Sequence, residues 1–184
     1  NLTHLMPGPE ITYQSYGYGW ANLSNTPYRL FKQYDHEGGI HTPMIAHWPN
    51  GIKGKGTTRS TLSHLVDLMP TILEATSVKP AEKAGGAKRI AWDGRSILPS
   101  LLGKTQPDPA VLFFNHARGK AIRTGNWKLV FNKDGKKKAK WELYDLGKDP
   151  NELNDLATEY PERVERLAKL WNAREKNQLA RSAK

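Results

Sequence analysis

Lys32 is the first residue of the chain whose type and neighbours suggest chemistry. It lies shortly before a Glu37-Gly38-Gly39 turn, in the stretch FKQYDHEGG. Glycine lets a backbone approach its neighbours closely, so a lysine ammonium beside such a turn could face a tetrahedral oxyanion. Most lysines, however, are simply exposed to solvent. From the residue types alone, an anion contact and an ordinary surface lysine both stay open for Lys32.

The same stretch carries other titratable side chains. Asp35 and Glu37 could pair as a general acid and base, as neighbouring carboxyl groups sometimes do. Three histidines could ligate zinc if they shared one face, although no carboxylate stands at a supporting spacing. These histidines are His36, His41 and His47. The chain has no cysteine, which excludes disulfides and thiolate metal sites. The sequence also lacks a Gly-x-Ser-x-Gly elbow, a phosphate-binding glycine loop and a His-Glu-x-x-His helix.

Charge narrows the classes of partner. The 184 residues carry a formal net charge of +10, which favours nucleic acid, sulfated glycan or an anionic surface. Much of this charge lies in residues 132–140, NKDGKKKAK, a run typical of a solvated hairpin tip. The aromatic residues do not alternate with Lys and Arg, so we expect no nucleic-acid partner. No apolar stretch reaches the ~18–20 residues of a membrane span, so we expect no membrane partner.

The elements that would position Lys32 are expected to be loops, one strand and one helix. Residues 1–30 are rich in Gly, Pro, Asn, Ser and Tyr, a composition typical of a long ordered loop. The apolar run Ile40–Trp48 predicts a strand. Asp67 is the predicted N-cap of a helix, with its carboxylate accepting backbone N–H groups of the next turn. Pro70 is tolerable in that turn, and the helix is expected to end near Ser77.

The C-terminal part is expected to form a sheet covered by a helix. Four short runs separated by Gly and Asn turns predict an antiparallel meander, namely AVLFFNH, KAIRT, WKLVFN and WELYDL. Pro161 is expected to open a helix whose apolar residues recur at helical spacing, namely Val164, Leu167, Ala168 and Trp171. The predicted fold class is therefore α+β, a four-stranded antiparallel sheet packed against a C-terminal helix. The predicted segments are 1–78, a linker at 79–110, and a subdomain at 111–184.

Five motifs follow one another along the chain. They are YRLFKQYDHEGGIHTPMIAHWPNGI, LSHLVDLMPTILEAT, WDGRSILPSLLG, AIRTGNWKLV and WELYDLGKDPNELNDLA. Their succession, from about Gly8 to Asn177, resembles the C-terminal part of type I sulfatases of the arylsulfatase family, within the alkaline phosphatase superfamily. The resemblance implies the C-terminal part of an α/β sulfatase fold and, for the full-length protein, a sulfuric ester hydrolase.

The resemblance implies roles for three residues. Lys32 stands at the position of the family's sulfate-contacting lysine, where its ammonium would neutralise charge on the sulfuryl oxygens as the S–O bond breaks. His116 stands at a strand end where relatives often place a pocket-facing residue, although ARGK replaces the usual Gly-Asn after it. The loop Tyr13–Asn25 would flank the same pocket, with Trp20 as a platform for a sugar or aromatic ring.

The resemblance also implies groups that these residues do not supply. Such sulfatases use calcium and a formylglycine made in a Cys/Ser-x-Pro/Ala-x-Arg motif. The sequence holds neither that motif nor the Asp-Asp and Asp-Asn pairs of the calcium site. We therefore expect the catalytic N-terminal sulfatase domain to lie outside these residues, and the chain alone to be inactive. In the whole enzyme, hydrated formylglycine would attack sulfur while calcium and Lys32 hold the sulfate.

The resemblance suggests partners and a compartment. The expected partners are the N-terminal sulfatase domain and a sulfate ester, such as a sulfated polysaccharide, and the expected location is periplasmic or secreted. Two alternatives stay open. A stand-alone basic module could bind sulfated glycan or another polyanion, although Ile40–Trp48 would then be a strand with unpaired edges. A phosphodiesterase or phosphonate hydrolase of the same superfamily would differ in the nucleophile motif.

Overall fold

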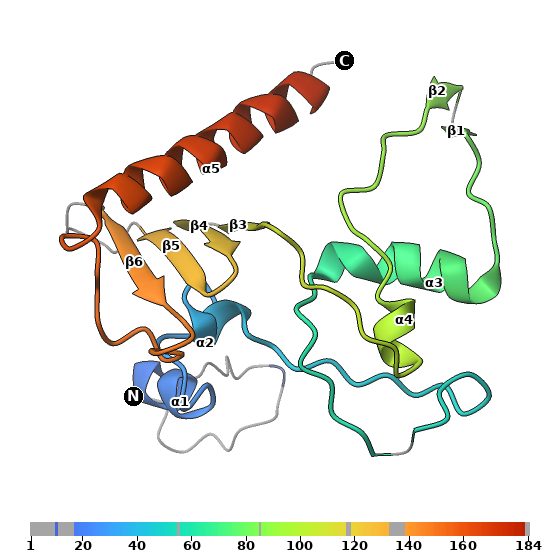
Figure 1. Ribbon diagram of the computed structural model, residues 1–184, viewed down its shortest axis with the longest axis horizontal. Helices are drawn as coiled ribbons and strands as arrows, with labels where there is room; N and C mark the ends of the chain where they lie inside the picture. The colour runs from blue at the N-terminus through green and yellow to red at the C-terminus, as the bar shows by residue number, and fades with distance from the viewer. Residues whose placement is uncertain are drawn as a thin grey trace. The chain divides into compact units, whose positions relative to one another are not determined.

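The computed structural model describes residues 10, 17–54, 56–84, 86–116, 119–132 and 139–182 (Figure 1). Most of the predicted hairpin tip and part of the predicted Tyr13–Asn25 loop lie outside the described residues. The chain divides into two compact units, of which the first joins residues 1–42 to residues 113–184 and the second comprises residues 43–112. These units follow different boundaries from the predicted segments, because the start of the chain groups with its end.

The first unit is built on the predicted antiparallel meander. Its strands are β3 (Leu112–His116), β4 (Gly119–Thr124), β5 (Trp127–Asn132) and β6 (Trp141–Asp145), and they lie side by side in sequence order. β4 pairs with β5 over its whole length, and β5 pairs with β6 so that Lys128 stands opposite Tyr144. The four-stranded sheet expected from the sequence is confirmed.

Helix α5 (Pro161–Ser182) covers one face of this sheet, as Figure 1 shows in red. Pro161 opens it, since a residue without an N–H costs nothing in the first turn. Leu167 and Trp171 of its apolar stripe are buried, and the Trp171 indole N–H donates to the Phe114 carbonyl of β3 at 3.3 Å. The predicted α+β arrangement of sheet and C-terminal helix is therefore confirmed.

The opposite face of the sheet carries polar side chains and is covered by the N-terminal segment. Because side chains alternate along a strand, one face of β5 and β6 presents Lys128, Asn132, Glu142 and Tyr144. Against this face lies the segment that carries α1 (Tyr18–Leu23) and α2 (Glu37–Ile40), blue in Figure 1. Residues 1–30 are thus not wholly loop, since α1 forms within them.

The predicted strand Ile40–Trp48 is wrong. Ile40 closes α2, and the structure assigns no strand to residues 41–48. A strand exists only through hydrogen bonds to a neighbour, and no described segment pairs with these residues. Their side chains are exposed, and Ile45 is 94% exposed. The predicted Glu-Gly-Gly turn forms a single helical turn, at the start of α2.

The second unit contains short elements joined by long connections. They are the 3₁₀-helix η1 (Leu65–Asp67), α3 (Leu68–Thr76), the two-stranded ribbon β1 (Lys83–Ala84) and β2 (Ala87–Lys88), and α4 (Leu98–Leu101). α3 ends at Thr76, and its C-cap residue Ser77 adopts the left-handed conformation at φ 57°. The predicted end of this helix is confirmed. No helix in the described part of the chain is both long and apolar enough to cross a membrane.

Asp67 does precede α3, but its predicted hydrogen bond to the next turn is wrong. Its carboxylate accepts instead from the backbone N–H groups of His64 and Arg95, each at 2.8 Å. An N-cap side chain bonds the second or third helical N–H, and the third helical residue of α3 is Pro70, which has none. The carboxylate therefore stabilises the start of η1 and fixes the backbone at Arg95, the residue after Gly94.

Candidate functional site

Lys32 lies in a loop formed by residues 28–41, which we call the lysine loop. Its side chain is exposed, and two nearby residues adopt positive φ, 64° at Leu30 and 103° at Gln33. Residues other than glycine reach such angles at a cost of roughly 1–3 kcal/mol each, so surrounding contacts must hold them there. The lysine loop is therefore a fixed turn whose geometry depends on its flanks.

Gly38 and Gly39 let the lysine loop fold back on itself. A β-carbon at Gly38 would lie 2.1 Å from the Leu30 carbonyl oxygen, and one at Gly39 would lie 2.0 Å from that of Tyr34. The Gly38 N–H donates to the Arg29 carbonyl at 3.0 Å. The close backbone approach expected from the two glycines thus occurs, and it is an approach to the loop's own main chain.

Lys128 of β5 lies beneath the lysine loop with its side chain 0% exposed. Its ammonium is 2.7 Å from Glu37 Oε1 and 2.9 Å from Glu152 Oε1. The other oxygen of Glu152 accepts the Glu37 backbone N–H at 2.7 Å. Burial alone would raise the pKa of Glu37, but the Lys128 ammonium lowers it below its ordinary value. A charge buried this completely is tolerable because it is paired on two sides.

His41 extends this cluster toward solvent. Its Nδ1 lies 2.7 Å from Glu37 Oε2, and its half-exposed ring stacks on Tyr28 at 4.4 Å between centroids. His41 and Tyr28 stand at the two ends of the lysine loop, so the stack closes its base. His41 therefore joins the Glu37 carboxylate to the Tyr28 ring.

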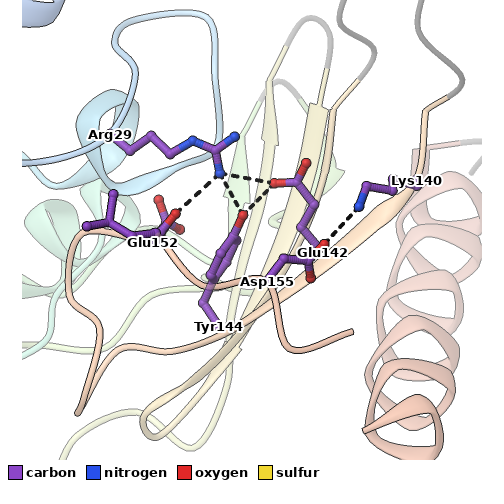
Figure 2. Close-up of a pocket in the computed structure, with 7 residues that line it drawn as sticks. Arg29, Lys140, Glu142, Tyr144, Glu152 and Asp155 are labelled. Atoms are coloured by element: carbon purple, nitrogen blue, oxygen red, sulfur yellow. Dashed lines mark hydrogen bonds and ion pairs between the residues drawn. The ribbon is translucent and has the colours of Figure 1, made fainter. Parts of the chain in front are cut away.

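Arg29 forms a second set of contacts, drawn in Figure 2. One guanidinium nitrogen donates to the Tyr144 hydroxyl at 2.6 Å, to Glu142 Oε2 at 3.3 Å and to the Glu152 carbonyl at 3.3 Å. The Tyr144 hydroxyl donates to Glu142 at 2.6 Å. Burial and this hydrogen bond raise the pKa of Tyr144, so the phenol stays protonated. These groups line a pocket of about 280 Å³, together with Lys140, Leu153 and Asp155.

Each charged side chain of this pocket has an ionic partner, either within the pocket or beside it. Lys140 is 2.9 Å from Asp155, and His36 Nε2 is 2.9 Å from Glu142 Oε2. The hydrogen bond from His36 is the main cause that lowers the pKa of Glu142 to about 2. A carboxylate held ionised by three partners is a poor general base. The pocket therefore serves as an anchor for Arg29 and offers no reactive group of its own among the residues described.

Asp35 is buried beside this network without a hydrogen-bond partner among the described residues. A β-carbon at Gly119 would lie 2.4 Å from Asp35 Oδ2 and 2.1 Å from Asn132 Oδ1, so the absent side chain of Gly119 makes room for both oxygens. Burial raises the pKa of Asp35 to about 6, against the lowering effect of His116, Lys128 and His36.

The sequence matches one family model over most of its length. Residues 28–179 match the family described as N-sulphoglucosamine sulphohydrolase, C-terminal. The chain belongs to this family. It corresponds to the C-terminal part of sulfatases, and the network above lies within the matched residues.

Curated sulfatases resemble the chain over a comparable range. An uncharacterized sulfatase of Schizosaccharomyces pombe is 33% identical over 159 residues, covering 85% of this chain and 28% of that protein. Arylsulfatase K of Mus musculus is 30% identical over 139 residues, covering 73% and 25%. The chain thus spans about a quarter of the length of these relatives.

Solved structures share the fold. A chain from work on glycosaminoglycan metabolism by Bacteroides thetaiotaomicron superposes with a TM-score of 0.65 at 24% identity, covering 81% of this chain and 32% of that one. A second protein, solved with its substrate D-glucosamine-2-N,6-O-disulfate, gives a TM-score of 0.51 at 25% identity, covering 70% and 27%. The two structures agree with the sulfatase C-terminal fold.

The three residues singled out from the sequence all lie in the first unit. Trp20 is 66% exposed on α1, whose Tyr18 ring meets Phe31, the neighbour of Lys32, at 5.4 Å. His116 is exposed at the end of β3. No hydrogen bond, ion pair or ring contact joins any two of Lys32, Trp20 and His116, and their roles in a sulfatase site stay predictions. The described residues contain no group of three His, Asp or Glu side chains that could hold a metal ion.

Sequence reasoning missed the network that anchors the lysine loop. Its members on the sheet, Lys128, Glu142 and Tyr144, alternate along β5 and β6. Polar residues at alternate positions normally indicate a solvent-facing side of an antiparallel sheet. A usable signal was present in WKLV, where a lysine stands inside an otherwise apolar strand. Such a lysine is expected to be buried and paired.

Proposed function

We propose that this chain supplies the sulfate-contacting lysine, Lys32, of a sulfuric ester hydrolase that acts on sulfated sugars. The observation that supports it is the placement of Lys32: an exposed ammonium at a fixed turn, anchored on both flanks, in a member of a sulfatase C-terminal family. An exposed lysine on a disordered tail would lack the orientation that charge stabilisation requires.

The chemistry proposed for Lys32 is electrostatic. A sulfate ester carries negative charge on its nonbridging oxygens, and the leaving oxygen gains charge as the S–O bond breaks. An ammonium held in place stabilises this charge without reorganising, which is commonly worth several kcal/mol in a site that excludes water. Lys32 forms no ion pair with any described residue, whereas the ammonium groups of Lys128 and Lys140 are paired with carboxylates.

Sulfated sugars are the proposed substrate class. One structural relative was solved with a disulfated glucosamine as its substrate. Trp20 offers an exposed indole on α1, and a sugar ring packs well on such a face. His116 is proposed to contact the substrate from the end of β3. The proposed compartment is the periplasm or the cell exterior.

Calcium and formylglycine belong to the proposed whole enzyme. The described residues do not form a set that fits a calcium ion, and the chain has no cysteine. We propose that both groups are supplied by a domain outside these residues, and that this chain alone hydrolyses no sulfate ester. What the chain contributes is binding and orientation by its own side chains.

The test is the Lys32→Ala substitution in the full-length protein. Loss of one key electrostatic contact is expected to lower kcat/KM for a sulfated sugar by at least ~100-fold. Lys148→Ala, which removes an exposed lysine at the turn after β6, is the control and is expected to change kcat/KM less than about twofold. A drop of only two- or threefold for Lys32→Ala would remove Lys32 from the site.

A further inference from the structure

We propose that Lys128 is a positioning residue for Lys32, acting through Glu37 and Glu152. This inference rests on the proposed function, because positioning has meaning only if Lys32 contacts substrate. Lys128 lies on β5, far from Lys32 in sequence, and its side chain is fully buried beneath the lysine loop.

The burial of three charges is the first step of the argument. The side chains of Lys128, Glu37 and Glu152 are 0%, 5% and 0% exposed. Desolvating such groups costs several kcal/mol each, and well-packed apolar residues often give equal or greater stability. A buried cluster of this kind is therefore a weak source of stability, but it imposes one geometry on the segments it joins.

The cluster fixes the main chain on one side of Lys32. Glu152 accepts the backbone N–H of Glu37 at 2.7 Å, while Lys128 holds the Glu37 side chain at 2.7 Å. A main-chain atom and a side chain of the same residue are thus both fixed. The start of α2 cannot shift without breaking a buried charge-assisted hydrogen bond.

Glu152 also holds the other flank. Its carbonyl oxygen accepts from Arg29 at 3.3 Å, and its own backbone adopts φ 57°. One residue therefore reaches both ends of the turn that presents Lys32, through its carbonyl on one side and its carboxylate on the other. Lys128 keeps this carboxylate in place by neutralising it together with Glu37. Without the ammonium, two buried carboxylates would face each other.

Lys128→Met tests the inference, since it keeps most of the unbranched side chain and removes the charge. In the full-length protein, hydrogen exchange of the backbone amides of residues 29–41 is expected to speed up at least ~10-fold. The β4–β5 ladder amides are expected to change less than about threefold. Lys169→Met, which breaks only an exposed pair with Glu165, is the control and is expected to alter neither set.

A double-mutant cycle separates positioning from general damage. Lys128→Met is expected to lower kcat at least ~10-fold in the presence of Lys32. In a Lys32→Ala background the same change is expected to cost less than about twofold, because the group being positioned is already gone. Independent, additive losses would overturn the inference. So would equal loosening of the lysine loop and the ladder.

The remaining outcomes are also decisive. If Lys128→Met unfolds the protein, Glu37→Gln replaces it, because this change keeps Lys128 paired with Glu152. It is expected to loosen the lysine loop and to show the same non-additivity with Lys32→Ala, and additivity there would refute positioning. If the parent protein hydrolyses no sulfated sugar, the proposed function fails. Faster hydrogen exchange confined to residues 29–41 of Lys128→Met would then still show that Lys128 holds the loop. Exchange rates equal to those of the parent would refute that as well.

Discussion

At the scale of single residues, Asp35 is a buried acid that the fold leaves without hydrogen bonds from the described residues. Its carboxyl group is fully buried, and neither oxygen has a hydrogen-bond partner among the described residues. The nearby charges of His116, Lys128 and His36 favour ionisation, yet burial outweighs them and raises its pKa to about 6. Burial therefore favours the protonated form of this side chain over the ionised form.

This imbalance predicts how stability depends on pH at Asp35. Because the folded pKa of about 6 lies above the ordinary 3.8, the folded state binds an extra proton between these values. The contribution of Asp35 is most favourable below pH ~4 and is lost as pH rises through ~6, by about 2–3 kcal/mol in all.

Asp35→Asn removes this penalty. The unfolding free energy of the variant relative to the parent is expected to rise from pH 4 to pH 7 by about 2–3 kcal/mol, measured by urea unfolding. Glu159→Gln, on an exposed side chain, is the control and is expected to show no such trend. A difference that stays flat across this range would contradict the raised pKa.

The residues of the site divide into those visible in the sequence and those revealed by the fold. Lys32 could be singled out because it stands beside two glycines in a motif shared with sulfatases. Lys128 stands out only as a lysine inside an apolar strand, and its partners could not be predicted, because the contacts of Glu37 with Lys128 and with Glu152 span 91 and 115 residues of sequence. Local patterning carries no information about which distant segment covers a polar sheet face.

At the scale of elements, Lys120 of β4 contacts aromatic rings of α5 and of the two strands β5 and β6. Lys120 Nζ of β4 lies 4.1 Å from the Trp171 ring centroid and 5.4 Å from those of Phe131 and Trp141. A cation in contact with several ring faces gains more than an exposed one, since water no longer competes. This cluster supplements the apolar stripe that holds the helix on the sheet.

Lys120→Met tests this contact, since methionine keeps most of the stem and loses the charge. The unfolding free energy is expected to fall by about 1 kcal/mol, measured by urea unfolding. Lys176→Met, on the exposed side of α5, is expected to change it by less than about 0.5 kcal/mol. If the two substitutions had equal effects, the aromatic contacts of Lys120 would contribute nothing measurable.

Elements whose partners are adjacent in sequence could be predicted. The meander and α5 were expected from periodicity and turn residues, because hairpins pair neighbouring strands and a helix carries its own hydrogen bonds. The Ile40–Trp48 strand failed for the complementary reason. Its apolar residues met the composition of a strand, but a strand also requires a neighbour.

At the scale of the whole molecule, the two units differ in how well they bury apolar side chains. Most of the core residues, including Ile122, Leu129 and Leu143, belong to the sheet unit. Residues 43–112 expose many large apolar side chains, among them Ile45, Leu65 and Ile72. The second unit is therefore the less protected part of this chain.

Limited trypsin digestion of this chain is expected to reflect that difference. Cleavage is expected first at exposed basic residues of the second unit, such as Lys53, Arg59 and Lys79. Fragments containing residues 17–42 and 119–182 are expected to persist longer and to co-elute, because buried ion pairs and α2 join them. Mass spectrometry identifies the cuts. Equal rates of loss from both units would contradict the prediction.

The dependence of the lysine loop on distant residues also orders events on the ribosome. Glu152 follows Glu37 by 115 residues, so Lys32 is synthesised well before the residue that anchors its loop. At typical elongation rates of ~5–20 residues per second, the nascent loop waits roughly 6–23 s for its last anchor. A nonsense codon just before Glu152 would thus give a protein that contains Lys32 but lacks the residue that fixes both flanks of its loop.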